Sequence, residues 1–71
     1  MRYAVVFEKT GTGYSAYVPD LPGCVATGAD ADEIDRNIRE AIRFHIEGIR
    51  ADGDPVPSPT TDCRFVDPEA A

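Results

Sequence analysis

Three carboxylates are the first residues that could do chemistry, because nucleases of the two-metal type hold their ions with acidic side chains. They are Glu8, Asp20 and Asp62. Such sites need several carboxylates that converge on ions about 4 Å apart, and these three lie in separate segments with no spacing that brings them together. We therefore predict no metal site, and a metal-dependent nuclease stays only as the last of three functional alternatives.

The single histidine and the two cysteines are the remaining candidates for catalysis. At the helical spacing of about 100° per residue, His45 falls within an apolar stripe, and no nucleophile or orienting partner can be named for it. Cys24 and Cys63 have neither a C-x-x-C partner nor a nearby histidine, so two small buried thiols are expected rather than redox or zinc chemistry. The sequence thus predicts a protein that is not an enzyme, with no catalytic residues and no cofactor.

The stretch Pro19-Asp20-Leu21-Pro22-Gly23 predicts a corner of preset shape between two strands. Each proline fixes its own φ and keeps the preceding residue out of the α region, and Gly23 can adopt a φ that other residues avoid. Two roles remain open for Asp20. Its carboxylate could cap the turn that contains it, or it could bind an arginine or lysine of a partner protein.

Four segments carry the apolar content and spacing typical of β-strands. They are residues 2–8, 14–18, 24–27 and 61–66. The first is apolar on both faces, which favours a central position in a sheet. A Gly-rich connection, residues 9–13, joins it to the second segment and has the length of a hairpin loop.

One helix is predicted, beginning at Asp30 and ending near Gly53. Asp30 is a good N-cap, and Glu33 three residues later can complete a capping box. Gly53 suits the position after the last turn, and Pro55 prevents continuation. Apolar residues recur at intervals close to 3.6 and charged residues fill the opposite face. The apolar stripe consists of Ile34, Ile38, Ala41, Ile42, Ile46 and Ile49.

These elements predict an α+β fold in the order β-β-β-α-β. A three-stranded meander followed by a right-handed crossover places the last strand beside the first, in the sheet order 3-2-1-4. One domain is expected over residues 1–66 and a loose C-terminal tail over residues 67–71. Because a single helix covers only one face of the sheet, the other face and the exposed edges must be met by another chain or tolerated.

The chain has 71 residues and a formal net charge of −6. A core of this size rarely supplies more than about 3–5 kcal/mol, so a homodimer or larger homo-oligomer is expected to add stability. The acidic balance disfavours direct contact with nucleic acid, which needs clustered Lys and Arg, and suits a basic protein partner. No apolar run approaches the roughly 20 residues that span a bilayer, and no signal peptide is recognised, so we expect a cytoplasmic protein.

Most of the chain resembles the HicB-like antitoxins of HicA/HicB toxin–antitoxin pairs. The resemblance is carried by Y-V-P-D-L-P-G-C-V-A-T-G at residues 17–28, D-E-I-D-R-N-I-R-E-A-I at 32–42, H-I-E-G-I at 45–49 and G-D-P-V-P-S-P at 53–59. It implies a partial ribonuclease H-like fold that lacks the catalytic residues of that fold, in agreement with the predicted order of elements.

The resemblance also implies a function. A HicB-like antitoxin would neutralise a small, basic, mRNA-cleaving HicA-type toxin by covering its active face. Complete family members often carry a C-terminal DNA-binding domain, and we expect this chain to lack one. Independently of the resemblance, the candidate partner contacts are Asp20, Tyr17, Leu21 and Tyr14. The two tyrosines are either anchors for a partner, since Tyr is favoured at interfaces, or ordinary sheet residues. The alternative is a solitary HicB-like oligomer with a structural or regulatory role and no toxin partner.

Overall fold

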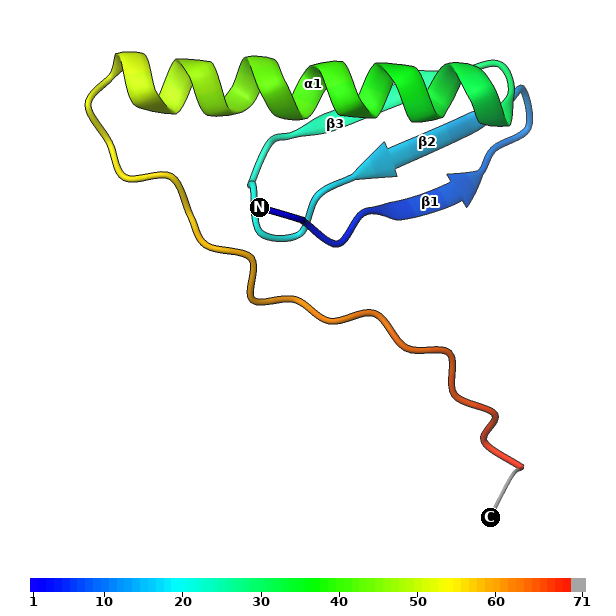
Figure 1. Ribbon diagram of the computed structural model, residues 1–71. Helices are drawn as coiled ribbons and strands as arrows, with labels where there is room; N and C mark the ends of the chain where they lie inside the picture. Colours follow the sequence, from blue (N-terminus) through cyan, green and yellow to red (C-terminus); the bar gives the residue numbers. More distant parts are fainter. Residues whose placement is uncertain (70–71) are drawn as a thin grey trace.

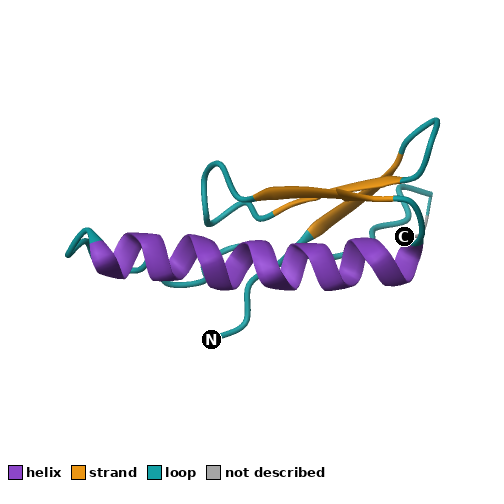
Figure 2. Cartoon of the chain, turned by 90° about the horizontal axis from the view of Figure 1, so that it is seen from above, coloured by secondary structure: helices purple, strands orange, loops and turns teal. Residues whose placement is uncertain are grey.

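A computed structural model describes residues 1–69 of the chain (Figure 1). Three strands, β1 (Val6–Lys9), β2 (Tyr14–Tyr17) and β3 (Val25–Gly28), form an antiparallel meander in the order β1-β2-β3, and the helix α1 (Ala31–Ala51) follows. The helix packs on β3 and β2. Figure 2 shows it along one face of the sheet, while the opposite face stays open. The predicted α+β class is confirmed.

The helix begins and ends where the sequence predicts, because its capping groups are satisfied. The carboxylate oxygen Oδ1 of Asp30 accepts a hydrogen bond from the backbone N–H of Glu33 at 2.8 Å. At the other end Gly53 has a φ of 75°, and the N–H of Asp54 donates to the carbonyl of Ile49 at 3.1 Å. Together these features form a Schellman motif, which satisfies carbonyls of the last turn.

The hydrophobic core lies between the helix and the inner face of the sheet. Its buried side chains are Ala16, Val18, Leu21, Cys24, Ile34 and Ile38. The predicted helical stripe is confirmed, since two of its members are buried and the others are half-buried against the same cluster. The prediction of two buried thiols holds for Cys24 and is wrong for Cys63, which is exposed. Burial raises the pKa of the Cys24 thiol and so keeps it protonated and unreactive.

The first strand is shorter than predicted and lies at an edge of the sheet. Only Val6–Lys9 pairs with β2, whereas Tyr3 and Val5 lie in the segment before β1 and still pack against the core. The phenolic hydroxyl of Tyr3 donates a hydrogen bond to the carbonyl of Pro57, which ties this segment to the chain beyond the helix. The central position predicted for the first strand needs a neighbour on its other side, and the described part of the chain supplies none.

The predicted fourth strand, residues 61–66, is not formed in this structure. These residues are exposed and have no strand assignment, so the order 3-2-1-4 is absent from the described chain. Figure 1 shows the path of the chain: beyond the C-terminal end of α1 it passes on the side of the N-terminus and β1 and then runs away from the sheet. We call residues 61–69 the C-terminal segment. Of the predicted loose tail, residues 67–69 are exposed, and residues 70–71 lie outside the described part of the chain.

Candidate partner-binding surfaces

The corner between β2 and β3 is closed by its own backbone. The N–H of Leu21 donates to the carbonyl of Val18 at 3.1 Å, and the N–H of Cys24 donates to the carbonyl of Leu21 at 3.0 Å. The N–H of Val18 in turn donates to the carbonyl of Cys24 at 3.1 Å. Gly23 has a φ of 85°, a left-handed conformation that favours glycine. The predicted use of Gly23 in this corner is therefore confirmed.

Asp20 does not cap this turn. Its carboxylate binds two threonines, Thr60 just before the C-terminal segment and Thr61 at its start. The N–H groups of Thr60 and Thr61 donate to Oδ2, both at 2.9 Å, and their hydroxyls donate to Oδ1 at 3.0 and 2.8 Å. We call these three residues the Asp20 clamp. It fastens the chain beyond the helix to the β2–β3 corner, and the contact with a partner's arginine or lysine stays a prediction.

The clamp also holds the Asp20 carboxylate in its charged form. The backbone N–H of Thr61 is the largest cause, followed by the N–H of Thr60, and the pKa of Asp20 falls from 3.8 to about 2. Hydrogen bonds that favour the charged form lower the pKa of a carboxyl group in this way. Since the folded-state pKa is lowered, the clamp's stabilisation is complete above pH 3.8 and is lost as the pH falls through about 2.

We therefore expect the amide proton shifts of Thr60 and Thr61 to titrate with a midpoint near 2 in NMR spectra recorded between neutral and acidic pH. Asp20→Asn is the matched control, because it keeps the shape of the side chain but has no ionisable group, and this titration should disappear. A midpoint near 3.8, the ordinary value for an aspartate, would show that the clamp is absent in solution.

The face of the sheet opposite the helix is uncovered. Paired residues in an antiparallel sheet point to the same face, so the pairing of Val6 with Tyr17 and of Tyr17 with Val25 forms one row across all three strands. Tyr17 is 42% exposed and Val25 is 64% exposed. We call Val6, Tyr17 and Val25 the outer row. Apolar and aromatic side chains that gather on an open face are typical of a protein-binding surface.

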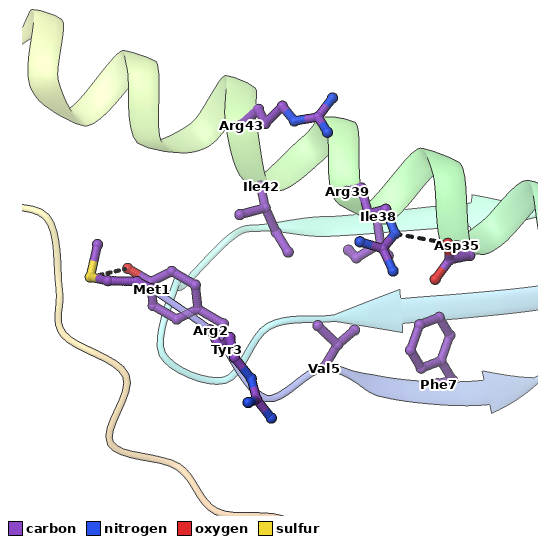
Figure 3. A pocket seen from close by; sticks show the side chains of 10 residues that line it. All are labelled: Met1, Arg2, Tyr3, Val5, Phe7, Asp35, Ile38, Arg39, Ile42 and Arg43. Atoms are coloured by element: carbon purple, nitrogen blue, oxygen red, sulfur yellow. Dashed lines mark hydrogen bonds and ion pairs between the residues drawn. The ribbon is translucent and has the colours of Figure 1, made fainter.

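A groove of about 530 Å³ lies on the other side of the molecule, between α1 and the N-terminal segment that continues into β1 (Figure 3). Figure 3 shows Ile38 and Ile42 pointing from the helix toward Val5 and Phe7, which are also part of its lining. Its basic lining residues are Arg2, Arg39 and Arg43. The sequence prediction missed this groove, because it placed the first strand in the middle of the sheet. The adjacent pairs Ile38-Arg39 and Ile42-Arg43 are the signal that could have revealed it.

The four predicted partner contacts do not form one surface. Tyr17 lies in the outer row and Asp20 lies in the clamp. Tyr14 is half-buried and packs against the core. Leu21 is 0% exposed, so its side chain supports the corner from inside and offers no surface to a partner. The sequence predicted the corner but not that the Leu21 side chain points inward from it.

The acidic and histidine candidates for chemistry stay apart in the structure. Within residues 1–69 no three His, Cys, Asp or Glu side chains gather closely enough to hold a metal ion. Asp20 uses both oxygens in the clamp, Asp62 pairs with Arg64 at 2.9 Å, and Glu8 is exposed on β1. His45 is half-buried on the helix. Among the described residues there is also no helix with the length and apolar character needed to cross a membrane.

The sequence matches one family over nearly its whole length. A model of the HicB-like antitoxins of bacterial toxin–antitoxin systems matches residues 3–69. An uncharacterised protein from the rep-hol intergenic region of Haemophilus phage HP1 is 44% identical over 57 residues, and a UPF0150 protein of Helicobacter pylori is 47% identical over 52 residues. These alignments cover 80% and 73% of this chain, and 43% and 72% of the two relatives.

Two solved structures are similar in fold. A chain from the HicA3 and HicB3 toxin–antitoxin complex superposes with a TM-score of 0.73, and the crystal structure of antitoxin HicB3 superposes with a TM-score of 0.71, both at 38% identity. Each covers 84% of this chain, which corresponds to 70% of the chain in the complex and 44% of the HicB3 chain. This chain therefore spans less than half the length of the phage relative and of that HicB3 chain.

Proposed function

This chain belongs to the HicB-like antitoxins of bacterial toxin–antitoxin systems, and we propose that it binds and neutralises a small, basic toxin of the HicA type. The observation that carries the proposal is the likeness to a chain from the complex of HicA3 with HicB3. Binding would cover the face of the toxin that cleaves mRNA, so that antitoxin and RNA compete for it. The protein would do so in the cytoplasm, as a homo-oligomer that contacts neither nucleic acid nor membrane and performs no catalysis.

We assign the outer row to the toxin. It is the apolar part of the sheet face that α1 leaves open, and Tyr17 stands at its centre between Val6 and Val25. A tyrosine offers a large apolar ring and a polar hydroxyl, which is why it is favoured at interfaces. The net charge of −6 would speed the approach of a basic partner.

Co-expression with the small basic protein encoded beside this gene tests the proposal. We expect restored growth of cells that carry the toxin, together with co-purification of the two proteins in a stoichiometric complex. Purified toxin should also stop cleaving RNA when the antitoxin is added. A toxic neighbour that is neither bound nor inhibited at low salt would overturn the proposed function.

Tyr17→Ala is expected to weaken the complex by about tenfold or more in Kd, because a central aromatic side chain is lost from the interface. Phe44→Ala is the matched control. Phe44 is also exposed, at 79%, but it lies on α1 and outside the outer row, so its removal should leave Kd within about twofold. Calorimetry or surface plasmon resonance measures both values. If the two variants weaken binding equally, the toxin does not bind at the outer row.

A solitary oligomeric module is the second candidate function, and the exposed C-terminal segment favours it. This segment is extended and has no partner strand within the described chain. If its partner is another copy, the assembled sheet would regain the four-strand order 3-2-1-4 of a partial ribonuclease H-like fold. The module would then form a stable oligomer whether or not a toxin is present, and co-expression with the neighbouring protein would have no effect on growth.

A further inference from the structure

The C-terminal segment has the features of a β-strand without a partner. Its hydrogen bonds after the clamp are internal: Arg64 with Asp62 at 2.9 Å, and the N–H of Glu69 with Asp67 at 2.9 Å. Phe65 is 107% exposed and Val66, the next residue, is 77% exposed. Large apolar side chains and unpaired backbone groups on one extended stretch favour the addition of this stretch to a sheet.

The free edge of β1 offers the matching backbone groups. The N–H of Thr10 donates to the carbonyl of Gly13 at 2.8 Å, so these two residues form a hydrogen-bonded pair at the end of the hairpin. Bonded and non-bonded pairs alternate along an antiparallel ladder, and Phe7 pairs with Ala16 three positions further along. Phe7 therefore belongs to a non-bonded pair, and its N–H and carbonyl point to the free edge, where a fourth strand can pair with them.

The groove beside β1 suits the side chains of the C-terminal segment. Phe7, 47% exposed, points into this groove together with Val5, Ile38 and Ile42. Side chains alternate along a strand, so a strand paired with β1 can direct Phe65 into the groove. The charges match as well. The segment carries Asp62, Asp67 and Glu69 against a single arginine, Arg64, whereas the groove is lined by Arg2, Arg39 and Arg43 with one acid, Asp35.

The clamp keeps this segment away from the edge of its own copy. Asp20 holds Thr60 and Thr61 at the β2–β3 corner, and Tyr3 holds the carbonyl of Pro57. From there the chain diverges from β1 (Figure 1). Each copy thus carries a free strand and a free edge that do not meet, and two copies related by a two-fold axis can satisfy both at once.

We propose that residues 62–66 of one copy add as a fourth strand to the free edge of β1 in a second copy, with Phe65 in the groove, and that the exchange is reciprocal. The partner surface is therefore a second copy of this chain. The inference specifies the interface of the homo-oligomer in the proposed function, and it concerns the edge of β1 rather than the outer row. The test of this interface uses the protein without toxin, so its outcome does not depend on whether the protein binds a toxin.

Phe65→Asp should raise the dimer dissociation constant by about tenfold or more, because a charge replaces the aromatic ring in an apolar groove. Sedimentation equilibrium of the full chain measures this constant. Phe44→Asp is the matched control, since it makes the same change at another exposed phenylalanine, on α1, and should leave the constant unchanged. A monomeric full chain, or a dimer that Phe65→Asp does not weaken, would overturn the proposal.

A half-labelled sample identifies which copy receives the strand. Carbon-13-labelled and unlabelled chains are mixed, unfolded and refolded together, and an isotope-filtered NOESY spectrum then records only contacts between copies. We expect cross-peaks from the Phe65 ring to methyl groups of Val5, Ile38 or Ile42 of the other copy. If the filtered spectrum lacks these cross-peaks and an unfiltered NOESY spectrum contains them, the segment has folded back on its own β1 and the exchange is wrong.

Discussion

Leu21→Ala is expected to lower the free energy of unfolding by about 2–5 kcal/mol, the usual cost of emptying a fully buried leucine site. Leu21 is 0% exposed and is one of the three largest completely buried side chains, with Ile34 and Ile38. A domain of this size rarely has more than about 3–5 kcal/mol of stability, so the loss is comparable to the whole stability of the domain. Urea titration followed by circular dichroism measures the loss.

The corner limits how far the structure can relax around the cavity that Leu21→Ala leaves. Leu21 stands between Asp20, which is fixed by the clamp, and Pro22, whose φ is fixed. Its backbone bonds to both Val18 and Cys24, so the chain cannot collapse easily into the cavity. Leu21→Met is the control, because it nearly conserves volume and should cost less than about 1.5 kcal/mol. An alanine variant as stable as the methionine variant would show that Leu21 is not buried in solution.

Gly13→Ala is expected to cost about 3 kcal/mol, at the upper end for overpacking. A Cβ at Gly13 would overlap with the carbonyl oxygen of Gly28 and would lie 3.0 Å from the Cα of Ala29. Both obstacles are backbone atoms, so no side-chain rotation relieves the clash. They are also held in place, since Gly28 pairs with Tyr14 and Ala29 precedes the helix N-cap.

The same loop supplies the control for this prediction. Gly11 lies two residues earlier, and a Cβ there would have no neighbour within 4 Å. Gly11→Ala should therefore change the free energy of unfolding by less than about 0.5 kcal/mol, as most surface substitutions do. Thermal and urea unfolding of both variants make the comparison. Equal stabilities would mean that β2 and β3 do not approach at Gly13 as closely as described.

The two proposed interfaces lie on different surfaces, so their variants should be separable. The toxin is assigned to the outer row around Tyr17, on the face that the helix leaves open. The exchanged strand is assigned to the edge of β1 and the groove near Phe7, on the helix side. We expect Tyr17→Ala to leave the dimer intact. We expect Phe65→Asp to leave the outer row folded. The toxin could therefore bind a dimer.

Asp20 shows what sequence reasoning could not decide at the candidate site. Its place between two prolines predicted a local cap or a contact with another protein. The structure instead joins it to Thr60 and Thr61, 40 and 41 residues later. Nothing in the local sequence marks a hydrogen bond across such a distance, because a carboxylate accepts equally well from any backbone N–H or hydroxyl that the fold brings near.

Local chemistry let the sequence by itself determine the three-stranded meander, the helix from its Asp30 cap to Gly53, the corner at Gly23 and the buried stripe of Ile34 and Ile38. Each depends on interactions between residues a few positions apart, such as capping, φ preferences and the period of apolar residues. The tertiary structure alone decided that β1 is an edge strand, that Asp20 clamps the C-terminal segment, and that residues 61–66 find no partner strand within the described chain. The apolar pattern of a strand specifies which of its faces is buried, but not which other strand lies at its edge. Backbone pairing is the same for every strand, so only the path of the chain decides which two edges come together.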